Sequence, residues 1–93
     1  MIFGIFRISG HSMMPNFLPG DRVIASSLPY FFKNPRKNDV IVFRYNKKML
    51  IKRIIRIQNE KYFVMGDNKK DSLKVGALKK NEILGKVIHV LMY

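Results

Sequence analysis

The chain contains no cysteine, and this absence excludes a disulfide framework, a thiolate metal site and a thiol nucleophile. Histidine is also scarce, because His11 and His89 are too few for a histidine-based metal cluster unless carboxylates complete it. No apolar run approaches the roughly 20 residues that a membrane-spanning helix requires. We therefore expect no metal site and no transmembrane segment in this chain.

Acidic side chains are scarce as well. Six Asp and Glu stand against eighteen Lys and Arg, which gives a formal net charge of +12. Such an excess opposes compaction and attracts polyanions or anionic membrane surfaces. The 93 residues suffice for one core, so we expect a single domain over residues 1–93. With 47% hydrophobic residues, the chain can build that core and is not a disordered tail.

The chain does contain short apolar runs rich in Val, Ile, Phe and Tyr, a composition that favours β-strands. Turn residues separate these runs, notably Pro19-Gly20, Asn38-Asp39 and Gly66-Asp67-Asn68. The expected strands are residues 1–8, 21–26, 39–45, 49–58, 61–65 and 83–92. The sequence therefore predicts an all-β domain with few or no helices, built as a small half-open β-barrel.

One candidate for chemistry is Ser12, which follows a glycine-containing bend and precedes Pro15. A serine presented in this way can have free backbone N–H groups around it, as a nucleophile with an oxyanion hole requires. A serine in a tight turn is more often only a turn or capping residue, so this segment alone assigns no function.

A second candidate is Lys52, which shares one face of the expected strand 49–58 with Leu50 and Ile54. Apolar neighbours disfavour an ammonium and lower the pKa of a lysine from about 10.4. A general base must be neutral, so such burial would be functional. A lysine that extends to the rim of a sheet is the simpler structural explanation, and Lys52 alone leaves both explanations open.

Several short motifs occur together in the order of a known family, and they extend over most of the chain. The motifs are Ser12-Met13-Met14-Pro15, Pro19-Gly20-Asp21, Asn38-Asp39-Val40-Ile41-Val42-Phe43, Lys52-Arg53-Ile54, Gly66-Asp67-Asn68 and Ser72. This order resembles the type I signal peptidases, which are serine proteases with a Ser–Lys dyad. The resemblance runs from about Ser9 to Val90 and implies the fold of a signal-peptidase catalytic core.

The resemblance implies a role for each matching residue. Ser12 would be the nucleophile, Lys52 the general base, and Ser72 the serine whose hydroxyl orients the lysine. The Ser12 backbone N–H would form the oxyanion hole. Some family members add a serine hydroxyl two residues before the nucleophile, and Gly10 occupies that position here, so this donor is missing.

Two further groups of residues match the family near its site. Gly66, Asp67 and Asn68 match a structural turn beside the dyad. Met13 and Met14 resemble residues beside the substrate groove, although simple core packing explains them equally well.

The chain also departs from the family pattern. Asn16 replaces the usual threonine after the motif's proline, and Lys74-Val75-Gly76 replaces an Asp-Ser-Arg element that braces the site with an ion pair. Only a few residues separate Arg53 from Tyr62, where full-length signal peptidases carry a long insertion. The chain is therefore more similar to the short nickel superoxide dismutase maturation proteases and the organelle processing peptidases.

The resemblance implies a serine endopeptidase that cleaves a preprotein or propeptide after small residues, works without a cofactor and acts as a monomer. The alternative is a basic β-barrel that binds nucleic acid without protease activity. Its stacking aromatics would be Phe43, Tyr45, Tyr62 and Phe63, but core packing explains these residues more simply. We therefore expect a protein substrate and no nucleic acid.

Residues 28–32 form an apolar, aromatic run that we expect to be a loop, because Pro29 prevents regular strand pairing. Its aromatic residues either fold back onto the core or dip into a lipid interface above a basic collar. The residues of this second arrangement are Tyr30, Phe31, Phe32, Lys33, Arg36 and Lys37. It predicts association with the cytoplasmic membrane, and a cytoplasmic location is the alternative.

Overall fold

The structure is a computed structural model that describes residues 2–70 and 75–91. These residues form six strands, one short α-helix and one 3-10 helix. The elements are β1 (Phe3–Arg7), β2 (Arg22–Ser26), α1 (Pro29–Phe32), β3 (Val40–Tyr45), β4 (Lys48–Gln58), β5 (Lys61–Met65), η1 (Lys80–Glu82) and β6 (Ile83–Leu91). Each strand overlaps one of the expected apolar runs, because β-branched and aromatic side chains suit a pleated, half-buried surface.

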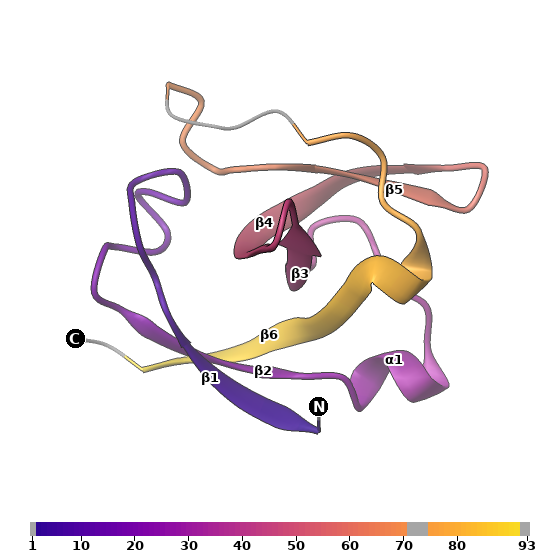
Figure 1. Cartoon of the computed structure of the whole chain (residues 1–93), viewed down its shortest axis with the longest axis horizontal. Coiled ribbons are helices and arrows are strands. Elements are labelled where there is room, and N and C mark those ends of the chain that lie inside the picture. The colour runs from indigo at the N-terminus through magenta and orange to yellow at the C-terminus, as the bar shows by residue number, and fades with distance from the viewer. Residues whose placement is uncertain (1, 71–74, 92–93) are drawn as a thin grey trace.

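All six strands belong to one antiparallel sheet with the order β1-β2-β6-β3-β4-β5. Figure 1 shows the sheet bent, with β5 above, β1, β2 and β6 below, and β3 and β4 between them. Within the described residues, β1 and β5 are the edge strands and do not pair with each other. The predicted fold class, an all-β half-open barrel with few or no helices, is confirmed.

Two hairpins, β3–β4 and β4–β5, are closed by two-residue turns in which both residues have positive φ. The angle is 50° at Asn46 and 66° at Lys47, and it is 52° at Asn59 and 63° at Glu60. This is the type I′ pattern, whose twist matches that of paired strands and which favours Asn at its first position. The β3–β4 turn sets the register of β4 against β3 and so places Lys52 opposite Ile41. The register against β5 shifts between Ile54 and Arg56.

Residues 28–32 contain the single helical turn α1, so the prediction of a loop was wrong. Pro29 lies in the first turn, where its fixed φ suits a helix and its missing N–H breaks no helical bond. The turn folds Tyr30 back against the core cluster and leaves Phe31 and Phe32 69% and 84% exposed. Folding back and exposure, which we treated as alternatives, therefore both occur, on different residues.

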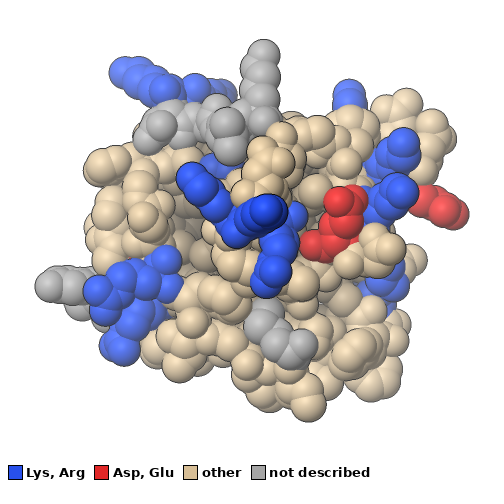
Figure 2. Space-filling model, viewed as in Figure 1, with Lys and Arg blue, Asp and Glu red and all other residues tan. Residues whose placement is uncertain are grey.

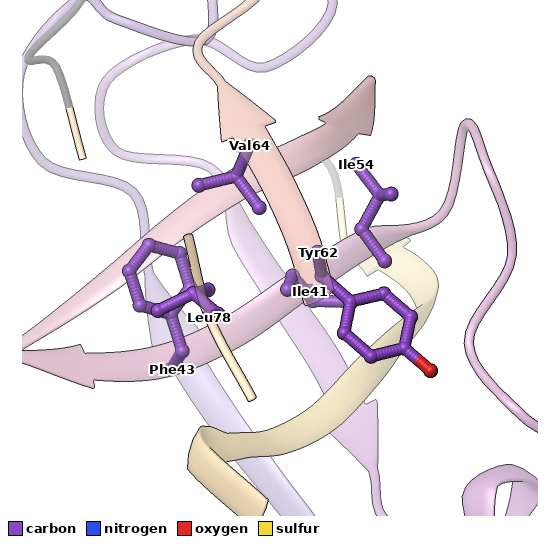
Figure 3. Close-up of a cluster of buried hydrophobic side chains, with 6 residues drawn as sticks. All are labelled: Ile41, Phe43, Ile54, Tyr62, Val64 and Leu78. Carbon is purple, nitrogen blue, oxygen red and sulfur yellow. The ribbon is translucent and has the colours of Figure 1, made fainter. Parts of the chain in front are cut away.

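The core consists of two clusters of buried hydrophobic side chains. The first lies among β3, β4, β5 and the segment before η1 (Figure 3), and comprises Ile41, Phe43, Ile54, Tyr62, Val64 and Leu78. The second comprises Ile8, Met13, Phe17, Val23 and Val40. Because Met13 and Phe17 come from the connection between β1 and β2, the second cluster attaches this connection to the sheet.

The connection between β1 and β2, residues 8–21, is a loop closed at its base. Ile8 N–H donates to the Asp21 carbonyl at 2.7 Å, and Gly20 N–H donates to the Ile8 carbonyl at 2.9 Å. The Asp21 side chain, only 5% exposed, accepts a hydrogen bond from Leu18 N–H at 3.0 Å. The φ of Gly20 is 92°, a left-handed value that favours glycine. The loop is thus held at both ends and can keep the residues at its tip in place.

Candidate active site

The loop of residues 8–21 and strand β4 bring Ser12 and Lys52 together. Lys52 Nζ donates a hydrogen bond to Ser12 Oγ at 2.6 Å, although 40 positions separate the two residues in sequence. Lys52 is only 4% exposed, whereas Ser12 is partly exposed. The distance lies within the range that a nucleophile and its base require. The pair can therefore exchange a proton directly.

The face of β4 that carries Lys52 is apolar. Ile54 is fully buried, and Leu50 packs against the same core cluster. Lys52 stands opposite Ile41 of β3, which is also fully buried. Lys52 therefore lies on a face of the strand that is largely removed from water.

Ser12 and Lys52 line a cavity of about 250 Å³ between the end of β1 and the first half of β4. The lining residues are Arg7, Ile8, Ser9, Ser12, Met13, Lys48, Met49, Leu50, Ile51 and Lys52. Met13 is also a buried member of the second core cluster, so it serves both packing and the cavity wall. Met14 is half-buried and, among the described residues, does not belong to this lining.

The turn that follows β5 holds the backbone around Ser12. Asn68 N–H donates to the Ser12 carbonyl at 2.8 Å, and Asn68 Nδ2 donates to the His11 carbonyl at 3.0 Å. Gly66 is buried in the same turn, and Asp67 is half-buried. The turn thus holds two consecutive backbone carbonyls at the tip of the loop that carries Ser12.

Asp67 connects this turn to β4 and to the loop. Arg53 Nε donates to Asp67 Oδ1 at 2.8 Å and Arg53 Nη2 donates to Oδ2 at 2.9 Å, while Asn16 Nδ2 donates to Oδ2 at 2.8 Å. The hydrogen bonds from Arg53 hold the pKa of Asp67 below its usual value, burial opposes this, and Asn16 reinforces it. The same pair raises the pKa of Arg53. Sequence reasoning treated Asn16 only as a departure from a threonine and missed this contact.

Gly10 and Ser12, which the resemblance assigns to the oxyanion hole, lie in the loop of residues 8–21. Gly10 has a φ of +77°, and a Cβ there would meet no atom within 4 Å, so backbone conformation and not space favours glycine. Among the described residues, the Ser12 N–H donates to no backbone or side-chain acceptor. Ser72 and Lys74, which the sequence also singled out, lie outside the described residues.

The first half of β4 has an unpaired edge beside the cavity. Residues 48–53 pair with β3 on one side, whereas residues 53–58 pair with β5 on the other. Within residues 2–70 and 75–91, no strand pairs with residues 48–52 on the β5 side. An extended peptide can add to such an edge through main-chain hydrogen bonds, and it would then pass directly beside Lys52.

The aromatic residues proposed for a nucleic-acid platform lie largely inside the protein. Phe43 is fully buried, Tyr62 is 6% exposed, and Tyr45 and Phe63 are half-buried. Phe63 is also covered by Arg56, whose Cζ lies 4.2 Å from the ring centroid. A stacking platform needs exposed rings, so this burial argues against the nucleic-acid alternative.

The residues proposed for a membrane surface fall into two groups. Tyr30 is half-buried and donates to Asp39 Oδ2 at 2.8 Å. Burial, followed by the hydrogen bond to Asp39, raises the pKa of Tyr30. The exposed group comprises Phe31, Phe32, Lys33, Arg36 and Lys37. In the part of the chain that the structure describes, no helix is long and apolar enough to cross a bilayer.

Comparison with known proteins gives consistent matches. The family model "Signal peptidase, peptidase S26" matches residues 1–57, which is more than half of the chain and includes both Ser12 and Lys52. Signal peptidase I of Buchnera aphidicola subsp. Baizongia pistaciae (strain Bp) is 50% identical over 38 residues, 41% of this chain and 12% of that protein. The probable thylakoidal processing peptidase 2, chloroplastic, of Arabidopsis thaliana is 43% identical over 37 residues, 40% of this chain and 10% of that protein. The matched segments thus span about a tenth of these relatives' own length.

Proposed function

This chain belongs to the signal peptidase family, peptidase S26, and we propose that it is a serine endopeptidase whose catalytic dyad is Ser12 and Lys52. The observation that carries this proposal is the 2.6 Å hydrogen bond from Lys52 Nζ to Ser12 Oγ at the wall of a cavity. The burial of Lys52 supports it further, because a general base must be neutral.

In the proposed reaction, neutral Lys52 accepts the hydroxyl proton while Ser12 Oγ attacks the carbonyl carbon of the scissile peptide bond. The Ser12 N–H stabilises the oxyanion of the tetrahedral intermediate. When the carbon–nitrogen bond breaks, the Lys52 ammonium returns a proton to the leaving amine, and an acyl-enzyme ester remains. Lys52 then deprotonates a water that hydrolyses this ester and regenerates the Ser12 hydroxyl. We propose that the hydroxyl of Ser72 orients Lys52, as the family resemblance implies.

The proposed substrate is a preprotein or propeptide with small residues before the cut. The unpaired edge of residues 48–52 supports an extended binding mode, because it borders the cavity that contains Ser12. Met13 forms part of the cavity wall against which a substrate side chain would pack. Gly66, Asp67 and Asn68 act as positioning residues for the loop that carries Ser12. Met14 lies outside the cavity lining that the structure describes.

We also propose that the protein works as a monomer at the cytoplasmic membrane and contacts it reversibly through α1 and β1. Ser26 Oγ donates to the Ile2 carbonyl and accepts a hydrogen bond from Leu28 N–H, which ties the start of β1 to the start of α1. The exposed apolar side chains of these two segments are Ile2, Phe3, Ile5, Phe31 and Phe32.

A basic collar supports this membrane proposal. Lys33, Arg36 and Lys37 are exposed immediately after α1, where they would face anionic headgroups. Each basic residue near such a surface contributes about 1 kcal/mol. Three of them and several partly inserted apolar side chains suffice for reversible binding.

The experiment that tests the protease proposal is digestion of a peptide library that contains small residues at varied positions, so that cleavage after small residues can be detected. Mass spectrometry of the products identifies the bonds that are cut. We expect the wild-type protein to cut after small residues and the Lys52→Ala variant to cut none of these bonds. Absence of cleavage by the wild type, or equal cleavage by the variant, would contradict the proposal.

A further inference from the structure

Two cations, Arg7 and Lys48, lie on the wall of the cavity that contains Ser12. Arg7 ends β1 and Lys48 begins β4, and both side chains are exposed. Among the residues that the structure describes, the cavity lining includes no Asp or Glu. If Lys52 is the neutral base, Arg7 and Lys48 supply the charge of the cavity, and that charge is positive.

In the described part of the chain, no ion pair compensates this charge. The ion pairs among the described residues are Arg53–Asp67 and Lys86–Asp39, and neither includes Arg7 or Lys48. Arg7 stands directly opposite Arg22 in the pairing of β1 with β2. Like charges at such positions destabilise a sheet, so this arrangement does not serve folding.

The same face of the molecule contains further cations. Arg44 is exposed on β3 and Lys47 is exposed in the β3–β4 turn, next to Lys48. Figure 2 shows Lys and Arg side chains gathered in front of this turn, whereas the Asp and Glu side chains visible on this face lie to the right. An approaching peptide therefore meets a positive potential before it reaches the cavity.

We propose that Arg7 and Lys48 select substrates that carry an acidic side chain close to the scissile bond, an inference that rests on the proposed protease function. Lys48 lies four positions from Lys52 on β4. Because strands rise about 3.3 Å per residue, the two residues are roughly 13 Å apart along the strand. A peptide that pairs with the edge of residues 48–52 would place one of its side chains beside Lys48. That side chain would lie about four positions from the bond that is cut. A basic side chain at that position would be repelled.

The size of the effect follows from the exposure of both cations. Ion pairs at solvent-exposed sites are weak and screened by salt. We therefore expect kcat/KM to differ by about fivefold, and not by orders of magnitude, between an acidic peptide and the matching basic peptide. The difference should shrink at high ionic strength.

The test is an acidic and basic scan through a peptide that the library shows to be cut, with Asp or Lys placed in turn at each position within about five residues of the bond. The measured quantity is the ratio of kcat/KM for the Asp peptide to that for the Lys peptide. This ratio does not depend on how much of a variant is folded. We compare the wild type, the Arg7→Glu, Lys48→Glu double variant, and Lys61→Glu, which makes the same charge change on exposed β5.

We expect a ratio of about five at one or more positions in the wild type, a ratio below one in the double variant, and no change in Lys61→Glu. A ratio of one in the wild type, or an unaltered ratio in the double variant, would overturn the proposal. It would also be overturned if Lys48→Glu weakened binding to anionic vesicles and left the peptide ratio unchanged, because the cations would then serve the membrane.

Failure of the protease function itself is distinguished by a binding measurement. If the wild type cuts no peptide, neutral ones included, the proposed function is wrong. Fluorescence anisotropy of labelled Asp and Lys peptides bound to the Ser12→Ala protein then decides the charge preference alone. Tighter binding of the Asp peptide than of the Lys peptide would support recognition of an acidic side chain, provided that this preference is lost when Lys48→Glu is added to the Ser12→Ala protein. Equal binding of both peptides would overturn the proposal.

Discussion

Lys52 Nζ lies 2.6 Å from Ser12 Oγ and donates a hydrogen bond to it, from a buried position in the middle of a strand to the tip of a loop. Both ends of this contact are held from elsewhere. The two-residue β3–β4 turn sets the register that places Lys52 opposite Ile41, and Asn68 holds the Ser12 carbonyl. Substitutions at and around these residues therefore test both the chemistry of this contact and the parts of the fold that maintain it.

The rate of cleavage should depend on pH as expected for a neutral lysine base. Because Lys52 is buried among apolar side chains, kcat/KM should rise with an apparent pKa below that of a free lysine, about 10.4. A profile that still climbs at pH 10 would argue that Lys52 is only structural. The measurement is kcat/KM from about pH 5 to pH 10 with one library peptide.

Lys52→Arg should be inactive, because a guanidinium stays protonated in this range and cannot accept the Ser12 proton. The matched control is Lys61→Arg, which makes the same change at an exposed position of β5 and should keep wild-type turnover. Circular dichroism of both variants checks that the fold is retained. Turnover by a folded Lys52→Arg protein would exclude Lys52 as the base.

The Arg53–Asp67 pair should stabilise the fold in a pH-dependent way. The pKa of Asp67 is lowered in the folded state, mainly by hydrogen bonds from Arg53. Its contribution is therefore present above the unfolded pKa of about 3.9 and is lost as pH falls through the lower folded pKa. Asp67→Asn should reduce the free energy of unfolding by roughly 1–2 kcal/mol at pH 7 and flatten its acid dependence.

Urea unfolding at pH 7 and at several pH values below 4 measures this effect. Glu60→Gln is the control, because it removes an exposed carboxylate in the β4–β5 turn that has no ion-pair partner among the described residues. Equal pH dependence in Asp67→Asn and the wild type would show that the pair adds no stability.

Asn68→Ala should lower kcat more than it lowers stability. The substitution removes the side-chain hydrogen bond to the His11 carbonyl at 3.0 Å and so loosens the loop that carries Ser12. We expect kcat to fall about tenfold with a loss of roughly 1 kcal/mol in unfolding free energy. Asn81→Ala, at an exposed position of η1, is the control. Unchanged kcat would show that this bond does not position Ser12.

Membrane binding should depend on the exposed aromatic residues of α1. The Phe31→Ser, Phe32→Ser double variant should lose most co-sedimentation with anionic vesicles, because these side chains are 69% and 84% exposed and available to insert. The control is Ile55→Ser, Ile57→Ser on β4, where the exposed fractions are 40% and 41%. Equal binding of the aromatic variant and the wild type, or no binding by the wild type, would exclude this surface.

The strands could be predicted from the sequence because each is an apolar, β-branched run between turn residues, as in β3 and β5. The β3–β4 turn at Asn46 and Lys47 could not, since residues other than glycine rarely take positive φ in succession. Ser12 and Lys52 were each candidates from their local sequence, the family resemblance paired them as a dyad, and the fold brings them into contact. Their roles stay predictions.

Other features of the site depend on contacts between distant parts of the chain. Asn16 donates to Asp67 across 51 positions, and no local pattern indicates this bond. The helical turn α1 was missed because its four residues are too few for a helical period. Tyr30 turns inward since its hydroxyl finds Asp39, a partner that only the folded chain provides.

Turnover by Ser12→Ala is the most direct test of the central claim that Ser12 is the nucleophile. The hydroxyl lies in a partly exposed turn, so its removal should leave the thermal unfolding temperature close to that of the wild type. With one library peptide, kcat should fall by several powers of ten. A folded Ser12→Ala protein that cleaves the peptide at the wild-type rate would contradict the account.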